Sequence, residues 1–377
     1  MRIDRRVLGL QLCALAVTAC LAPAVAGASV PFGSLAALQR RIVTGTITES
    51  VPEGRFVVAR YDDYGRLSYQ VAALKRQRSL DPLIVIIGGS AVRECITDDD
   101  ELRHVVAKRS DVRIRVVTLA CAMQRLPSTL AIIDNLPRGS GIVVLGVRHT
   151  NFVGTFADAD AQLNGIPILL TSKALHDFMA GEYACDPPDS MTVGLQKYLD
   201  WYARSRGVPA FQGGETTYMR HRYDARGHLS LTTKQAMVPR FVQNFGTAPN
   251  GAFFAYFNFN AGLLRECVRL AHKKGYQVLL MEDPLDTAAV GTAYDTYEQM
   301  YLPACQEIAR QNDAHYVNIN QQAGLLDTDF YDLSHLLASG RAKWTPKLTD
   351  SLVQILHDHP AAGWRHLSWK DLPGHRR

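Results

Sequence analysis

The sequence predicts an α/β protein with a three-layer, doubly wound parallel sheet of five strands and a helical insertion. From residue 81 onward, short apolar runs alternate with amphipathic, helix-compatible segments. This alternation is typical of parallel strands joined by right-handed crossover helices. The first run, over residues 82–90, is apolar almost throughout rather than at every second position, which indicates a strand buried on both faces. The composition, 47% hydrophobic and 20% charged residues, is that of a globular protein.

Each predicted strand is a short aliphatic or aromatic run. The strands lie in segments 82–90, 112–120, 141–147, 276–284 and 314–319, and the helices in segments 98–108, 128–136, 261–274, 296–312 and 339–356. The first helix opens with acidic residues, which its dipole favours, and the third closes on Gly275. Because ligands of doubly wound sheets bind outside the carboxyl ends of the strands, residues directly after the strands are candidate site residues.

The N-terminus has the layout of an export signal. Three arginines in residues 1–6 precede an apolar stretch, and small residues with A-x-A spacing follow as far as Ala28. This pattern predicts a secretory signal peptide over residues 1–28. Two alternatives stay open: "VTAC" resembles a lipobox that would acylate Cys20, and residues 7–30 match the roughly 20 apolar residues of an uncleaved anchor. Each alternative places the rest of the chain in the periplasm or another extracytoplasmic compartment.

Two regions fall outside the alternation of strands and helices. Residues 29–80 are a leader segment that we expect to pack on the core, whereas residues 81–377 form the α/β domain. The stretch from about 150 to 257 is far longer than the usual connection of about 2 to 8 residues, so it is predicted to be a helical insertion beside the strand ends. Its aromatic and basic residues suit a carbohydrate platform, or the aromatic ones pack a small core; they include Trp201, Tyr202, Tyr218, His221 and Tyr223.

Charge and cysteine spacing argue against several functions. The net charge of +5 is dispersed and forms no basic patch after the N-terminus, so nucleic-acid binding is not predicted. The five cysteines after residue 28 have no paired spacing, which argues against a zinc site or a disulfide framework and favours buried thiols. The carboxylates of residues 281–286 have no histidine nearby and make an incomplete ligand set. We predict neither a metal nor a cofactor.

Gly88, Gly89 and Ser90 end the first strand abruptly. Small residues at such a position can simply turn the chain, or they can present a nucleophilic serine at the edge of the sheet. Arg93 and Glu94, which follow Ser90 by three and four residues, are either a solvated salt pair or a brace for the serine loop. Whether Ser90 is a nucleophile or only part of a turn depends on whether a general base and its orienting acid lie elsewhere in the sequence.

Asp332 and His335 supply such partners, because they lie three residues apart between the fifth strand and the last helix. A carboxylate so placed can fix the tautomer of the imidazole and stabilise the imidazolium, which leaves the opposite ring nitrogen for a serine. The alternative is a helix-capping Asp beside a surface His. Since Ser90 and His335 both follow strands of the same predicted sheet, we favour the arrangement with a shared site.

"GGSAVRE" after the first strand, together with "YDLSHL" near the C-terminus, resembles the SGNH (GDSL-like) hydrolase superfamily. The resemblance covers roughly residues 80–357 without the insertion, and it implies a flavodoxin-like three-layer sheet. It also implies that Ser90 is the nucleophile, His335 the general base and Asp332 its orienting acid. Exported members of this superfamily include polysaccharide O-acetyl esterases and transferases, and proteins that work beside membrane acyltransferases.

Two positions depart from the superfamily pattern. The loop after the second strand, "LACAMQRLP", has no Gly for the second oxyanion donor, so a backbone N–H between Ala120 and Met123, such as that of Ala122, would serve. After the third strand the superfamily has G-x-N, whereas here Gly146 is followed by Arg148 at the position of the Asn. The remaining oxyanion or substrate candidates are therefore Gly89, Arg148 and Asn151. Arg148 and His149 either bind an anionic or sugar group or belong to a solvated loop.

The sequence thus predicts a serine-dependent ester hydrolase or acyl (acetyl) transferase that acts on an extracytoplasmic glycan or a similar ester. The alternative is a non-catalytic SGNH-like protein that binds a glycan or assists a membrane O-acyltransferase. The missing oxyanion residues favour the alternative, because the loss of one such donor lowers a rate by about 100- to 1000-fold.

Overall fold

A computed structural model describes residues 81–163, 168, 170, 172–183, 221, 223–244, 251–361, 364 and 366, together with residues 67, 70, 71, 74 and 75. All of them belong to the compact unit formed by residues 45–377. The predicted signal or anchor with Cys20 lies outside the described residues, and so do Trp201, Tyr202 and Tyr218 of the predicted insertion.

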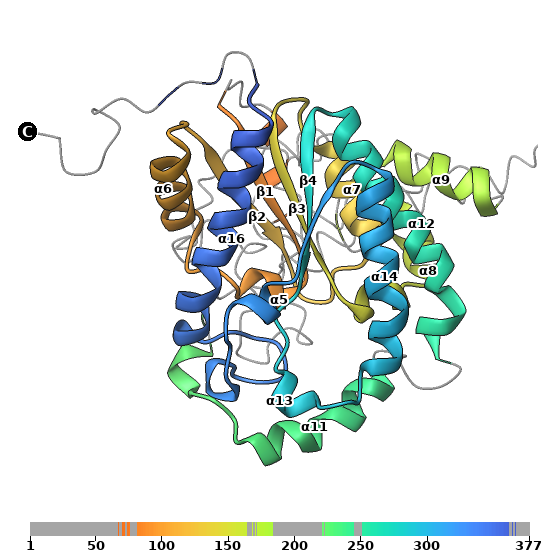
Figure 1. Cartoon of the computed structure of the whole chain (residues 1–377). Coiled ribbons are helices and arrows are strands. Elements are labelled where there is room, and N and C mark those ends of the chain that lie inside the picture. Colours follow the sequence, from red (N-terminus) through yellow and green to blue (C-terminus); the bar gives the residue numbers. More distant parts are fainter. Residues whose placement is uncertain are drawn as a thin grey trace, which may run out of the picture. The chain divides into compact units, whose positions relative to one another are not determined.

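The centre of the structure is a five-stranded, entirely parallel sheet, which confirms the predicted α/β class (Figure 1). Its order is β2-β1-β3-β4-β5, with β1 (Leu83–Gly88), β2 (Arg115–Ala120), β3 (Gly141–Val147), β4 (Tyr276–Glu282) and β5 (His315–Val317). The register aligns Gly88 with Ala120, and Gly146 with Met281. The chain segments that leave these strands therefore start at one edge of the sheet.

The sheet is buried on both faces, because its strands alternate their side chains between two hydrophobic clusters. Ile84 and Ile86 of β1 belong to one cluster, and Val85 and Ile87 belong to the other. Helices α6 (Asp99–Ser110) and α16 (Ala338–Asp358) supply the first cluster, and α7 (Leu126–Asn135), α12 (Ala252–Lys273) and α14 (Asp295–Gln311) supply the second. Figure 1 shows these two sets of helices on opposite sides of the sheet. The three predicted layers are thus present.

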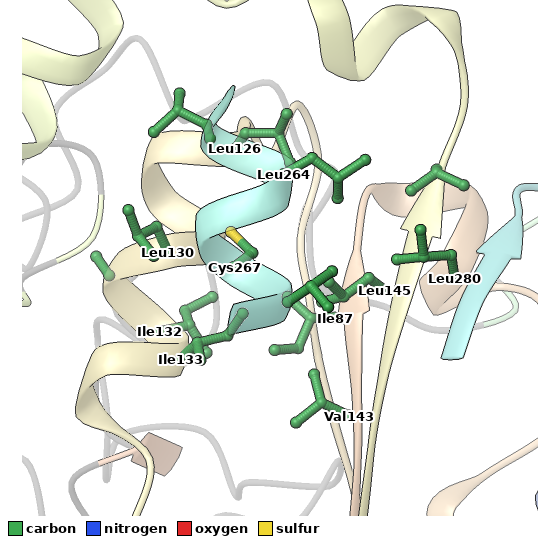
Figure 2. Packing of buried hydrophobic residues seen from close by; sticks show 14 of the residues in the cluster. Ile87, Leu126, Leu130, Ile132, Ile133, Val143, Leu145, Leu264, Cys267 and Leu280 are labelled. Carbon is green, nitrogen blue, oxygen red and sulfur yellow. The ribbon is translucent and has the colours of Figure 1, made fainter. Parts of the chain in front are cut away.

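The larger cluster shows how helix and sheet faces interlock (Figure 2). Leu130 and Ile133 of α7 lie beside Leu264 and Cys267 of α12, and both helices face aliphatic side chains of the sheet such as Leu145. Burial of a side chain of this size contributes about 1.5 to 3 kcal/mol. The described cysteines are all buried, as predicted: Cys121, Cys267 and Cys305 lie in this cluster and Cys95 lies in the other.

Two element boundaries differ from the sequence prediction by three residues or more. Helix α12 begins at Ala252 rather than at residue 261, because the aromatic stretch that precedes the predicted start continues the helix and buries Phe253 and Phe259. Strand β2 begins at Arg115 rather than at residue 112. Val112 instead forms an isolated antiparallel bridge with His366.

The described part of the stretch between β3 and β4 is mainly helical. After the short η1 (His149–Val153) it contains α8 (Phe156–Leu163), α9 (Lys173–Tyr183), η3 (Asp224–Arg226), α11 (Leu231–Asn244) and the first turns of α12. Helix α11 lies beside the short α13 (Thr287–Val290), beyond the end of the sheet at which α5 (Ser90–Arg93) follows β1 (Figure 1). Residues of this stretch therefore reach the carboxyl ends of the strands.

Few residues of the leader are described. Residues 67, 70, 71, 74 and 75 are helical, and Leu67, Val71 and Leu74 are buried in the larger hydrophobic cluster. Their spacing of four and three residues places them on one helix face. None of the helices in the described part of the chain combines the length and apolar character that a membrane crossing requires.

Candidate active site

Ser90 is the first residue of α5, a single helical turn directly after β1. Gly89 precedes it in an extended conformation, and the Arg93 N–H donates to the Gly89 carbonyl over 3.1 Å. A Cβ on Gly88 would lie 2.5 Å from Cγ2 of Val92, whereas a Cβ on Gly89 would meet nothing within 4 Å. Gly88 is therefore required for α5 to fold back against β1, and Gly89 leaves open space beside the serine.

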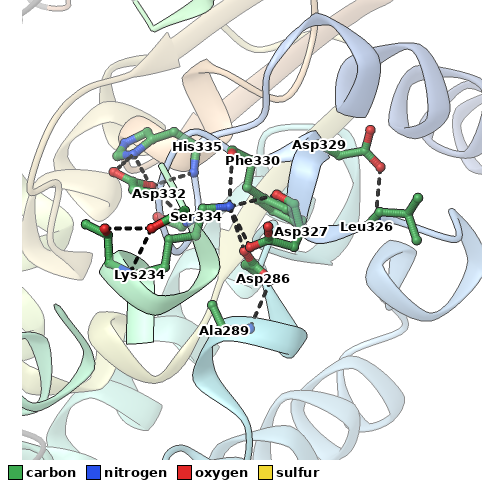
Figure 3. Close-up of polar contacts among 12 residues, drawn as sticks. Lys234, Asp286, Ala289, Leu326, Asp327, Asp329, Phe330, Asp332, Ser334 and His335 are labelled. Atoms are coloured by element: carbon green, nitrogen blue, oxygen red, sulfur yellow. Dashed lines mark hydrogen bonds and ion pairs between the residues drawn. The ribbon is translucent and has the colours of Figure 1, made fainter. Parts of the chain in front are cut away.

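The loop that carries Asp332 and His335 is closed at its base. Phe330 and Leu336 form an antiparallel bridge, and the Tyr331 N–H donates to the His335 carbonyl over 2.8 Å. Inside the loop, Oδ1 of Asp332 accepts the backbone N–H groups of Ser334 and His335, each over 3.0 Å. These bonds fix the carboxylate relative to the imidazole three residues later (Figure 3).

Ser90, His335 and Asp332 form one hydrogen-bonded chain. Nε2 of His335 lies 2.9 Å from Oγ of Ser90, and Nδ1 lies 2.8 Å from each carboxylate oxygen of Asp332. The side chains of Asp332 and His335 are only 10% and 14% exposed. With an ionised carboxylate on Nδ1, that nitrogen carries the proton, and Nε2 is free to accept from the serine hydroxyl.

The charge state of Asp332 suits this role. Burial works to raise its pKa, but the neighbouring His335 and the two backbone donors outweigh burial and lower the pKa to about 2. The carboxylate is therefore ionised throughout the neutral range. The structure brings these three predicted residues together, and His335 is largely buried rather than a surface histidine.

The predicted oxyanion candidates after β3 have other partners. Oδ1 of Asn151 accepts the backbone N–H of Arg148 over 2.8 Å, and Nε of Arg148 donates to Oγ1 of Thr150 over 2.8 Å. Both side chains thus stabilise the turn of η1. A Cβ on Gly146 would lie 2.2 Å from Cγ2 of Val92 and 2.5 Å from Oδ1 of Asp283, so this glycine gives room for close packing under α5.

The loop after β2 adopts a glycine-like geometry without a glycine. Met123 has a φ of 58°, in the left-handed region, and its side chain is 53% exposed. Left-handed non-glycine residues are strained and concentrate at functional sites. The Cys121 N–H donates to the Gly88 carbonyl over 3.1 Å, which holds this loop, including the half-buried Ala122, beside the end of β1. The loop therefore makes a left-handed turn beside the end of β1 although it contains no glycine.

Asp283, directly after β4, adds a second carboxyl group to the neighbourhood. It is 5% exposed, and burial raises its pKa to about 6, against the opposing positive charges of Arg148 and His335. Sequence reasoning considered this residue only as a metal ligand. Above about pH 6 it therefore adds a negative charge to this part of the site.

Arg93 and Glu94 are not a solvated pair. Their side chains are 1% and 0% exposed, and Nε of Arg93 lies 3.1 Å from Oε1 of Glu94. Oε2 of Glu94 accepts the backbone N–H of His221 over 2.7 Å. The expectation that this pair braces the serine loop fits these contacts, whereas the solvated alternative is wrong.

His149 is also buried, in contrast to both of its sequence interpretations. It is 2% exposed, its ring lies 4.2 Å from that of Tyr294, and burial together with the charge of Arg148 holds its pKa well below the usual value. The imidazole is therefore neutral and belongs to an aromatic core. Neither a ligand contact nor a solvated loop describes this position.

Lys234 is a site residue that sequence reasoning missed. Its Nζ is fully buried and lies 2.9 Å from Oδ2 of Asp286, 2.9 Å from Oδ1 and 2.7 Å from the carbonyl of Asp327, and 3.0 Å from the carbonyl of Phe330 (Figure 3). One ammonium group thus joins α11 to the segment after β4 and to the base of the Asp332–His335 loop. A lysine in an amphipathic helix normally indicates a solvated face, so the pattern contained no signal for this contact.

The sequence matches no protein-family model and no curated protein. Among solved structures, the chain is similar to a protein described as "a putative arylesterase" from Agrobacterium tumefaciens. The two chains are 10% identical, the comparison covers 73% of this chain and 100% of the other, and the TM-score is 0.31. A similarity at this score does not bear on the activity of this chain.

Proposed function

We propose that this protein is a serine-dependent ester hydrolase or acyl transferase in which Ser90, His335 and Asp332 act as nucleophile, general base and orienting acid. One observation carries the proposal: Nε2 of His335 lies 2.9 Å from Oγ of Ser90 while its Nδ1 faces the carboxylate of Asp332. This distance lies within the hydrogen-bond reach of about 2.6 to 3.2 Å that proton abstraction requires.

The reaction follows from these atoms. Oγ of Ser90 attacks the acyl carbonyl, its proton passes to Nε2 of His335, and Asp332 stabilises the resulting imidazolium. The tetrahedral intermediate then collapses, the C–O bond to the alcohol breaks, and His335 returns the proton to the leaving oxygen. Water or a sugar hydroxyl attacks the acyl-serine in the same manner and regenerates Ser90.

The oxyanion requires donors beside Ser90. The N–H groups in the first turn of α5 have no partner within the helix, because the first intrahelical bond runs from Arg93 to Gly89. We assign the first donor to the Ser90 N–H beside the open Gly89, and the second to the backbone of the loop at Ala122 and Met123. Each such donor contributes about 100- to 1000-fold to the rate.

For the substrate we propose an acetyl ester on an extracytoplasmic glycan. The support is the likeness of the Ser90 and Asp332–His335 motifs to the SGNH superfamily, together with the export signal or anchor that the sequence predicts in residues 1–28. A membrane acyltransferase is the proposed partner if the acyl group is transferred rather than hydrolysed.

The second candidate is a non-catalytic SGNH-like protein that binds a glycan or assists a membrane O-acyltransferase. The observation in its favour is that Arg148 stands at the position of the superfamily's oxyanion Asn and donates its Nε–H to Oγ1 of Thr150. A catalytic protein turns over an ester substrate and a non-catalytic one does not, so one hydrolysis assay distinguishes the two functions.

The test is the hydrolysis of 4-nitrophenyl acetate by the full-length protein. We expect turnover that falls by at least about 1000-fold in Ser90→Ala and in His335→Ala, because such groups act as a unit. Ser351→Ala, on the half-buried flank of α16, serves as the serine control and should leave the rate unchanged. Turnover that is absent from the wild type, or equal in Ser90→Ala, would refute the catalytic proposal and favour the non-catalytic one.

A further inference from the structure

One short segment between β3 and β4 connects the two halves of the proposed site. We call residues 221 and 223–226 the buttress. Its first residue, His221, donates its backbone N–H to Oε2 of Glu94 over 2.7 Å, and Nε2 of its ring hydrogen-bonds to the Thr97 carbonyl. The Glu94 N–H in turn donates to the Ser90 carbonyl over 3.1 Å. The start of the buttress is therefore fixed to the turn that carries Ser90.

The other end of the buttress is fixed near His335. Asp224 forms an ion pair with the guanidinium of Arg341 on α16, and Nη1 of Arg341 donates to the Leu336 carbonyl over 2.9 Å. The side chain of Arg341 is only 4% exposed. A buried, hydrogen-bonded arginine holds its partners more firmly than a surface pair does. The buttress is thus anchored on both sides of the reacting atoms.

Tyr223 lies between these two anchors and is 6% exposed. Its ring stacks on that of Tyr331, with 4.3 Å between centroids and 16° between planes. It also lies against the imidazole of His335, with 4.8 Å between centroids and 39° between planes. Ser90 and Asp332 occupy the two nitrogens at the edge of that imidazole, and Tyr223 covers its face.

We propose that Tyr223 is a positioning residue that holds the His335 imidazole in the plane joining Ser90 to Asp332. This inference rests on the proposed function. During the reaction the serine proton leaves Oγ, so the bond between Ser90 and Nε2 changes while the ring must keep its orientation. A ring packed on the face of the imidazole restricts its tilt, and the electron-rich face of a phenol also favours the imidazolium.

The burial of Tyr223 separates this role from direct substrate binding. A carbohydrate platform presents an aromatic face to solvent, whereas Tyr223 is almost fully covered and packs against two rings of the protein. Loss of its ring should therefore lower the reactivity of Ser90 rather than the affinity for substrate. Contacts of this kind correspond to about a three- to tenfold change in rate.

The experiment measures the rate at which a fluorophosphonate probe labels the full-length protein, together with kcat and KM for 4-nitrophenyl acetate. We expect Tyr223→Leu to label about tenfold more slowly than the wild type and to lose kcat at unchanged KM. Tyr223→Phe keeps the ring and should restore labelling to within about twofold. Circular dichroism verifies that each variant is folded.

Asp224→Asn is a second variant that leaves the ring of Tyr223 in place. It removes the charge that pairs with Arg341, at a side chain that is 34% exposed, and should slow labelling in the same direction by a smaller factor. If the wild type is labelled at Ser90 while Tyr223→Leu reacts equally fast or changes only KM, the positioning role is wrong and the proposed function stands. If the wild type is not labelled at Ser90, both are wrong.

Discussion

The substitution Lys234→Met tests how the base of the Asp332–His335 loop is held. Methionine preserves much of the volume of the side chain but removes the ammonium group. It leaves the carboxylate of Asp286, which is 1% exposed, and the carbonyls of Asp327 and Phe330 without their shared donor. Asp286 and Phe330 are each 1% exposed, so water does not replace the lost donor at these two residues, whereas the half-buried Asp327 keeps partial access to water.

The expected cost is large. Removal of one partner from a buried ion pair destabilises a protein by about 3 to 5 kcal/mol, because the remaining charge is buried without compensation. Burial already raises the pKa of Asp286, against the opposing effect of Lys234. Without Lys234 the carboxyl takes up a proton at a higher pH, so the destabilisation should be smaller at pH 5 than at pH 8.

Urea denaturation followed by circular dichroism measures the free energy of unfolding for this comparison. The double variant Lys234→Met/Asp286→Asn removes the unpaired charge and retains an oxygen that can accept the Ala289 N–H. It should therefore be at least about 1 kcal/mol more stable than the sum of the two single changes.

Lys173→Met is the matched control for this substitution. Lys173 pairs with Asp177 at the surface, where the two side chains are 82% and 55% exposed, so its loss should cost about 0.5 kcal/mol or less. Equal costs for the buried and the exposed lysine, or no coupling between Lys234 and Asp286, would contradict the reasoning.

Two further predictions concern stability. Burial raises the pKa of Glu282 from 4.5 to about 7 although two tyrosine hydroxyls donate to it, so the folded state binds this proton more tightly than the unfolded state. The free energy of unfolding should fall by about 3 kcal/mol as the pH rises from 4.5 to above 7, and Glu282→Gln should flatten that part of the curve in urea denaturation at stepped pH. Gly146→Ala should lower the stability by about 1 to 3 kcal/mol, because its Cβ would lie 2.2 Å from Cγ2 of Val92. Gly181→Ala, on an exposed helical position with nothing within 4 Å, should raise the stability by about 0.5 to 1 kcal/mol; equal effects of the two substitutions would contradict the packing argument.

The sheet could be predicted from the sequence because the strands are short, mainly apolar runs that alternate with helix-compatible segments. The boundary of α12 could not, since the stretch from Ala252 to Asn260 is aromatic on several sides and has no clear polar face until it is placed beside α14 and η1. Tertiary contacts, rather than local preference, extend this helix.

The proposed site also contains some residues that could be predicted from the sequence and others that could not. Ser90 and His335 were predictable because each follows a strand, and the topology of a parallel sheet brings such positions together. The contacts of Lys234 and Tyr223 were not, because their partners are separated from them by long stretches of sequence, and a lysine in a helix normally faces water. His149 is a further buried polar residue that the sequence did not indicate, since its burial depends on aromatic residues of α14 and on Tyr294 next to it.

The most direct test of the central claim is the site at which the full-length protein reacts with a fluorophosphonate. Intact mass and peptide mapping should find a single adduct on Ser90 in the wild type and none in Ser90→Ala or His335→Ala. A wild type that stays unmodified, or an adduct that persists in Ser90→Ala, would contradict the assignment of Ser90 as an activated nucleophile.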